Sequence, residues 1–118
     1  MAAVARVIDQ PALEVVIDTE HLSRMTLGEL SLQREVLALF DRQADMLLPR
    51  IRQGAPAMAA ASAHTLKGSA VGIGAFKVAR AVEEVEQARD AQIAAAVETL
   101  AAVLEEAKAE IARLLQAP

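Results

Sequence analysis

Apolar residues recur at helical spacing along most of the chain, and short breaks divide them into segments. Between Ser31, a suitable cap, and Gln53 they follow an i, i+3, i+4, i+7 pattern, which is typical of a helix with one buried face. The predicted buried positions are Gln33, Val36, Leu37, Phe40, Ala44, Leu47 and Ile51, widened on one flank by Leu32, Leu39 and Met46. Pro49 is expected to kink this helix or end it early, because proline lacks an amide hydrogen and clashes with the preceding turn.

Three more long helices are predicted downstream. Pro56 suits the first turn of a helix and Gly74 suits its end, so one helix is expected over residues 56–73. The next begins near Ala75, and the pair Arg89–Asp90 marks the turn after it. The last helix has the clearest period, with steps of four and three at Ile93, Val97, Leu100, Leu104, Ala107, Ile111 and Leu114. Together the segments predict an all-α fold, an antiparallel four-helix bundle.

The N-terminal part is expected to add one short helix to this bundle. It is placed at residues 18–25, where Asp18 or Thr19 can cap the first free amides. Residues 1–17 show no clean helical period, and they are expected to form a tail that packs loosely or against a neighbouring molecule. The bundle domain is therefore assigned to residues 18–118.

Composition and charge narrow the possible functions. The 118 residues suit one compact domain, and their 54% hydrophobic content with only 2% aromatic residues fits close-packed helices. Without cysteine there is no disulfide framework or thiolate metal site. A net charge of −4 lacks the basic surface of a nucleic-acid binder or of a protein anchored on anionic lipid. Neither a signal peptide nor a run of about 20 apolar residues occurs, so a soluble cytoplasmic protein is expected.

His64 is the candidate reactive residue. On a helical wheel the apolar residues Leu66, Ala70 and Ile73 fall roughly opposite it, so His64 is expected to face away from the core. Most neighbours on its own face are unusually small: Ala57, Ala60, Ala61 and Gly68, beside Lys67 and Val71. A solvated face usually carries long polar side chains. A small-residue surface around one imidazole instead leaves room for the backbone of another protein.

The residues around His64 suit phosphoryl transfer. Imidazole is a nucleophile near neutral pH, and a phosphoryl group on its nitrogen can be passed to a carboxylate. Lys67, at i+3, can approach the phosphoryl oxygens and offset their charge. Gly68 costs about 1 kcal/mol of helix propensity relative to alanine. We interpret this glycine as clearance for an incoming active site.

The stretch His64-Thr65-Leu66-Lys67-Gly68-Ser69, with Gly74 ten residues after the histidine, resembles the histidine phosphotransfer (HPt) domain family. The family pattern is His-x-(Leu/Ile)-Lys-Gly-(Ser/Ala), and the resemblance extends over about residues 18 to 116. It implies that His64 is the phosphoacceptor, that Lys67 stabilises the phosphoryl group and that Gly68 gives the partner clearance.

The same resemblance implies the partners. These are the receiver domain of a response regulator, with a phosphoacceptor aspartate, and a hybrid histidine kinase. Magnesium would belong to the receiver, and this chain would need no cofactor and no metal of its own. The chain shows no phosphate-binding glycine loop, so it is expected to be a carrier without ATP-dependent kinase activity. The carrier is also expected to be a monomer.

Several residues keep two interpretations. The candidates for a docking surface are Ala60, Ala61, Val71, Leu22, Met25, Leu32 and Leu39, of which the last four can equally be core residues. Gly72 can serve close helix packing instead of docking. His21 is expected to be an exposed residue or a local hydrogen-bond donor. Glu83, Glu84 and Glu86 are expected to form a solvated face.

Two classes of function follow from the sequence. The first is a phosphorelay carrier that is reversibly phosphorylated on His64, and a related option is the phosphotransfer part of a kinase that works with a separate catalytic domain. The second is a non-catalytic helical adaptor that has kept the fold and docks a receiver or kinase domain. Acid-labile, alkali-stable phosphate on the protein would distinguish the first from the second.

Overall fold

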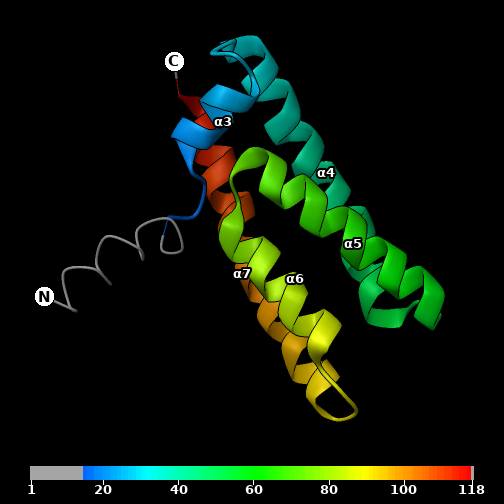
Figure 1. The fold of residues 1–118 in the computed structure, drawn as a ribbon. Helices are drawn as coiled ribbons and strands as arrows, with labels where there is room; N and C mark the ends of the chain where they lie inside the picture. The colour runs from blue at the N-terminus through cyan, green and yellow to red at the C-terminus, as the bar shows by residue number, and fades with distance from the viewer. Residues whose placement is uncertain (1–14, 118) are drawn as a thin grey trace, which may run out of the picture.

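The computed structural model describes residues 15–117 as an arrangement of helices, with no strand among them (Figure 1). The prediction of a tail falls mostly on residues 1–14, which lie outside the described residues. The helices are α3 (Thr19–Met25), α4 (Leu30–Gln53), α5 (Pro56–Ile73), α6 (Phe76–Gln87) and α7 (Gln92–Gln116).

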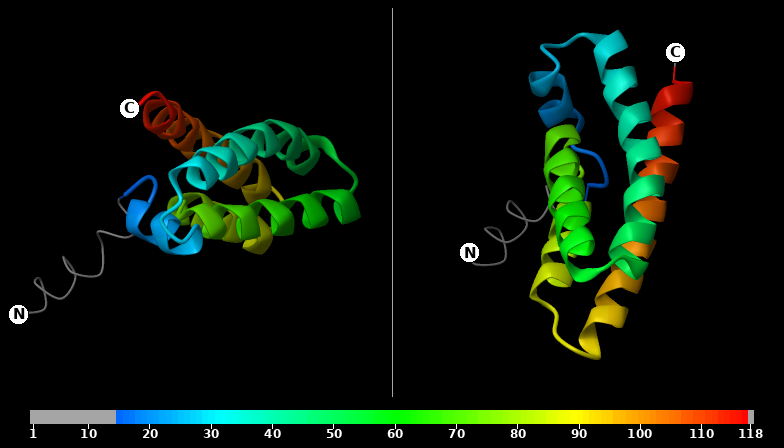
Figure 2. Two further views of the ribbon diagram at one scale, coloured as in Figure 1. Left: turned by 90° about the horizontal axis from the view of Figure 1, so that it is seen from above. Right: turned by 90° about the vertical axis from the view of Figure 1, so that its right-hand side faces the viewer.

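The four long helices alternate in direction and form a closed ring. Each packs against the next in the chain, and α7 returns to α4 (Figure 1). The short helix α3 lies at one end of the bundle, where it packs on α5 (Figure 2). The all-α prediction of an antiparallel four-helix bundle with a short extra N-terminal helix is therefore confirmed.

One continuous core fills the bundle and comes from the stripes that the periodicity predicts. Every long helix contributes a buried row, and the largest fully buried side chains are Phe40, Leu22, Leu66, Leu100, Leu104, Ile111, Val78 and Val82. Some predicted core positions differ. Ile93 is 44% exposed at the first turn of α7, and Leu39 and Met46, on the flank of the α4 stripe, are also exposed. Gln33, Val36 and Leu114 are only half-buried.

Two sets of backbone hydrogen bonds hold the α5–α6 turn. Gly74 has φ +81°, a left-handed conformation, and the amide of Ala75 donates to the carbonyl of Ala70 at 2.8 Å, which closes the C-terminus of α5. The amide of Asp18 donates to the carbonyl of Gly74 at 3.0 Å, and the Asp18 carboxylate caps α3 by accepting from the amide of His21 at 3.1 Å. The start of α3 is thereby fixed to this turn.

Gly74→Ala is expected to lower the free energy of unfolding by about 2–4 kcal/mol. An added Cβ would lie 2.7 Å from the carbonyl oxygen of Asp18, and the positive φ disfavours any side chain. Chemical denaturation measures the loss. Gly72→Ala is the matched control, because its Cβ would meet no described residue within 4 Å, and it should stabilise the protein by about 0.5–1 kcal/mol. Equal stability of the two variants would contradict the described turn.

The beginning of α4 and the effect of Pro49 differ from the predictions. The backbone turns through positive φ at Leu27 and Gly28, and the amide of Glu29 donates to the carbonyl of Thr26, so α4 begins at Leu30 and Ser31 is not its cap. Nor does Pro49 end the helix, which continues to Gln53. Pro49 itself is exposed, whereas Leu47 and Ile51 on either side of it are buried in the core.

Ordered packing also begins before the predicted domain boundary at residue 18. Ile17, which we assigned to the tail, is only 2% exposed and belongs to the core. Its burial follows from the backbone bond between Asp18 and Gly74, which holds the preceding residue against the bundle. The loose packing predicted for the tail is therefore wrong at Ile17.

Candidate functional site

His64 lies on the outer face of α5, as the helical wheel predicts. The opposite face of this helix is buried through Ser62, Leu66, Ala70 and Ile73, whereas His64 itself is exposed. Ala60 and Ala61, one turn earlier, are also exposed and present only methyl groups to solvent. The imidazole is thus accessible to a second protein.

A shallow depression of about 500 Å³ opens beside His64, between α5 and α6. Its lining residues are His64, Lys67, Gly68 and Val71 from α5 and Phe76, Ala79, Arg80 and Glu83 from α6. The structure therefore brings the three predicted motif residues His64, Lys67 and Gly68 to one surface. The geometry offers a nucleophilic imidazole an open approach, with cationic side chains at its edge.

Lys67 is held by a carboxylate from the neighbouring helix. Its Nζ atom donates to Oε1 of Glu86 at 3.0 Å, and the two side chains are 28% and 32% exposed. Glu86 is exposed, as predicted for a solvated face, and the α5–α6 packing also brings it within reach of Lys67. Glu83 and Glu84 are exposed, as predicted. The ion pair between Lys67 and Glu86 holds the ammonium of Lys67 one helical turn from His64.

Lys67→Ala is expected to slow phosphoryl transfer from a receiver to His64 by about ten- to hundredfold, because it removes a positive charge next to the transferring group. Rapid-quench assays with a phosphorylated receiver measure the rate, and binding of the unphosphorylated receiver should change little. Lys77→Ala is the matched control, since Lys77 also pairs with a glutamate of the next helix, at 2.7 Å from Glu106, but lines a different depression. An unchanged rate in Lys67→Ala would remove Lys67 from the mechanism.

Gly68 and Gly72 leave a strip of the α5 surface without side chains, which we call the bare ridge. A Cβ added at either position would meet nothing within 4 Å in the part of the chain that the structure describes. Close helix packing therefore does not explain Gly72, and that alternative is wrong. At Gly68 the open space agrees with clearance for a partner.

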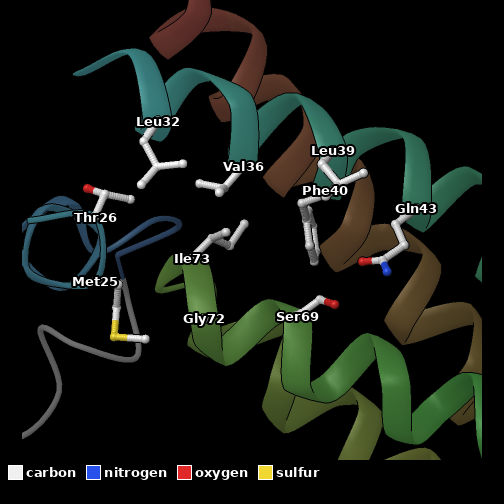
Figure 3. Close-up of a pocket in the computed structure, with 10 residues that line it drawn as sticks. All are labelled: Met25, Thr26, Leu32, Val36, Leu39, Phe40, Gln43, Ser69, Gly72 and Ile73. Atoms are coloured by element: carbon white, nitrogen blue, oxygen red, sulfur yellow. The ribbon is translucent and has the colours of Figure 1, made fainter. Parts of the chain in front are cut away.

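An apolar groove of about 280 Å³ lies on the other side of α5, where α3, α4 and α5 meet (Figure 3). Met25, Leu32 and Leu39, three of the predicted docking residues, line it together with Phe40 and Gly72. Met25 and Leu39 are 58% and 53% exposed. Figure 3 shows Leu32 directed toward Ile73, across the space between α4 and α5.

The other docking candidates divide between surface and core. Val71 is 42% exposed and lines the depression beside His64. Leu22 is only 2% exposed, so of its two interpretations the docking one is wrong and the core one is confirmed. On the seven-residue helix α3, Leu22 turns into the core while Met25, at the last turn, does not. Met46, which we placed on the core flank of α4, is 52% exposed.

His21 is not the exposed residue that the sequence suggests. Its ring packs edge-on against Phe76, with ring centroids 5.1 Å apart and an interplanar angle of 68°. Its Nε2 atom is buried and has no hydrogen-bond partner within residues 15–117. His21 therefore contacts Phe76, a residue of the depression, but does not itself line the depression.

The described residues hold neither a metal-binding cluster nor a membrane-spanning helix. Within residues 15–117, no three histidine, aspartate or glutamate side chains are grouped as a metal would require. None of the helices in the same range is both long and apolar enough to span a bilayer.

Sequence reasoning missed the α6 side of the depression, namely Phe76, Ala79 and Arg80. The signal that can identify these positions is the tight turn at Gly74. In an antiparallel hairpin, residues of the second helix return alongside those of the first, so positions after the turn lie next to the His64–Val71 segment. Hydrophobic periodicity alone does not give this alignment.

Comparison with known proteins agrees with the site. No curated protein and no solved structure matches the chain. The family model of the Hpt domain matches residues 35–117, which is more than half of the chain and includes the motif around His64. The match begins within α4, so it does not include α3. With its helical bundle and its His64-Lys67-Gly68 surface, the chain belongs to the histidine phosphotransfer (Hpt) domain family, whose role is phosphotransfer in two-component signalling.

Proposed function

We propose that this protein is a phosphorelay carrier that takes a phosphoryl group on His64 and exchanges it with the aspartate of a receiver domain. The observation that carries the proposal is the convergence of three residues at one surface. An exposed imidazole, an ammonium at i+3 and a bare glycine at i+4 line the same depression. A helix with no such role would gain stability from a longer side chain at position 68.

The chemistry requires positioning more than covalent machinery. When the second ring nitrogen carries a proton, the aspartate oxygen attacks phosphorus in line and forms the O–P bond. The N–P bond breaks, and its electron pair returns to the ring, which leaves as neutral imidazole. Magnesium is expected on the receiver. Lys67 offsets the charge of the three phosphoryl oxygens.

The deciding experiment is incubation with a receiver domain phosphorylated on its aspartate. We expect label on this protein that is acid-labile and alkali-stable, which is the behaviour of phosphohistidine. Incubation with ATP alone should give no label, because the carrier is proposed to have no kinase activity of its own. Failure to label with a panel of receivers and kinases, alongside retained receiver binding, would favour the adaptor.

We further propose that the apolar groove contributes to receiver docking. Leu39→Asp should weaken receiver binding about tenfold, because it places a charge on a surface that a partner must desolvate. Labelling of His64 by a small phosphoryl donor should not change. Ile93→Asp is the matched control on α7, where an apolar side chain of similar exposure, 44% against 53%, lies outside the groove.

Calorimetry and amide shift mapping measure the docking effect. Shifts that cluster on residues 93–116 and leave α3, α4 and α5 unchanged would contradict the proposed surface.

For the whole protein we propose a cytoplasmic, monomeric carrier that receives phosphoryl groups from a hybrid kinase. Sedimentation tests the oligomeric state, and reconstitution with candidate kinases tests the donor.

A further inference from the structure

The charges around the His64 depression nearly balance before any phosphoryl group is bound. Two cations, Lys67 and Arg80, and one carboxylate, Glu83, line it. Glu86 adds a second negative charge through its bond to Lys67. A phosphoryl group on His64 would bring about −1.5 to −2 further charges at neutral pH. The phosphorylated site therefore needs a cation whose side chain can reorient toward the phosphoryl oxygens.

Lys67 supplies only part of the positive charge that a phosphoryl group on His64 requires. Its ammonium is bonded to Glu86, so it reaches a phosphoryl group either by giving up that bond or by bringing a carboxylate near the phosphoryl oxygens. The second choice adds repulsion between like charges. Lys67 therefore supplies less than one uncompensated positive charge.

Arg80 is differently placed. It lies on α6 one turn after Phe76, which lines the same depression, and its side chain is exposed. Between residues 15 and 117 no carboxylate forms an ion pair with Arg80, and its guanidinium donates no hydrogen bond there. Glu83, at i+3, is its nearest acidic neighbour in sequence. An exposed pair at this spacing contributes only a few tenths of a kcal/mol in helices, so it does not compete with a doubly charged phosphoryl group.

We propose that Arg80 is a second phosphoryl-binding residue of this site, whose guanidinium donates to the phosphoryl oxygens on His64. The planar guanidinium can bond two phosphoryl oxygens at once, which a lysine ammonium does not do with the same geometry. Arg80 thereby supplies positive charge to the phosphoryl group, whereas the positive charge of Lys67 is offset by its ion pair with Glu86. This inference rests on the proposed function, because it requires a phosphoryl group on His64.

The test uses the full chain phosphorylated by phosphoramidate, whose P–N bond breaks as the ring N–P bond forms and ammonia leaves. The ³¹P chemical shift of phosphohistidine is then followed against pH. Arg80→Ala should move the titration midpoint of the phosphoryl group to higher pH, because a nearby cation favours its more negative form. Transfer to a receiver should slow by about tenfold. Arg80→Lys should recover part of both effects.

Arg42→Ala is the matched control, since Arg42 is an exposed arginine in the middle of α4 that does not line the depression. It should leave midpoint and rate unchanged. An Arg80→Ala protein with wild-type midpoint would overturn the inference, even if receiver binding fell, because that pattern describes a docking residue. Absence of label on His64 in the wild-type protein, from phosphoramidate and receiver alike, would instead overturn the proposed function and this inference with it.

Discussion

His64→Gln should abolish phosphoryl acceptance and leave the helical bundle intact. Glutamine lacks a nucleophilic nitrogen, so no N–P bond can form at position 64. Its side chain would lie on the exposed face of α5, opposite the buried residues Leu66 and Ala70, so no core contact is lost. We expect no label from a phosphorylated receiver and a melting temperature within about 2 °C of wild type, since exposed substitutions change stability by less than about 0.5 kcal/mol.

His21→Gln provides the control for this variant. His21 packs against Phe76 and its Nε2 atom is buried, so its replacement should lower stability and yet retain label on His64. Label that persists in His64→Gln would identify another acceptor. A lower melting temperature with loss of helicity in His64→Gln would contradict the exposed position of the imidazole.

Gly68→Gln is expected to raise stability and to reduce phosphotransfer at least a hundredfold. Among the described residues nothing lies within 4 Å of an added Cβ, so glutamine should stabilise α5 by up to about 0.5–1 kcal/mol through its helix propensity. The same side chain would occupy the space through which the receiver's aspartate approaches His64. Displacement of reacting groups by about 1 Å can cost a hundredfold in rate.

Gly68→Ala separates the two effects. Alanine gives a similar or larger gain in helix propensity but adds only a methyl group, so stability should rise while most of the transfer rate remains. Thermal melts and single-turnover transfer assays on both variants provide the measurements. A Gly68→Gln protein that transfers at the wild-type rate, or that is less stable than wild type, would show that clearance is the wrong explanation for this glycine.

The parts of the fold that were predictable depend on local signals. Pro56 and Gly74 delimit α5, and the apolar stripe on that helix is enough to orient His64 outward. Pro49 was harder to interpret, because the cost of proline inside a helix depends on what the flanking turns bury. Leu47 and Ile51 on either side both lie in the core, and their packing keeps α4 continuous.

The candidate site was predictable on α5 and not on α6. The motif gives His64, Lys67 and Gly68 directly, because all three share one helical face. The bond between Lys67 and Glu86 joins residues 19 positions apart, and it depends on how two helices are aligned across a turn. Leu22 and Met25 illustrate a second limit, because on a seven-residue helix periodicity does not say which apolar residue is buried.

The bare ridge of α5 separates two surfaces of different chemistry. On one side lies the charged depression beside His64, and on the other lies the apolar groove formed with α3 and α4. With the docking role proposed for the groove, substitutions in α3 and α4 are expected to change which partner fits while the residues around the imidazole stay the same. A duplicated copy of this gene could diverge toward a new partner through a few changes at positions such as Met25 and Leu39, without having to rebuild its reaction centre.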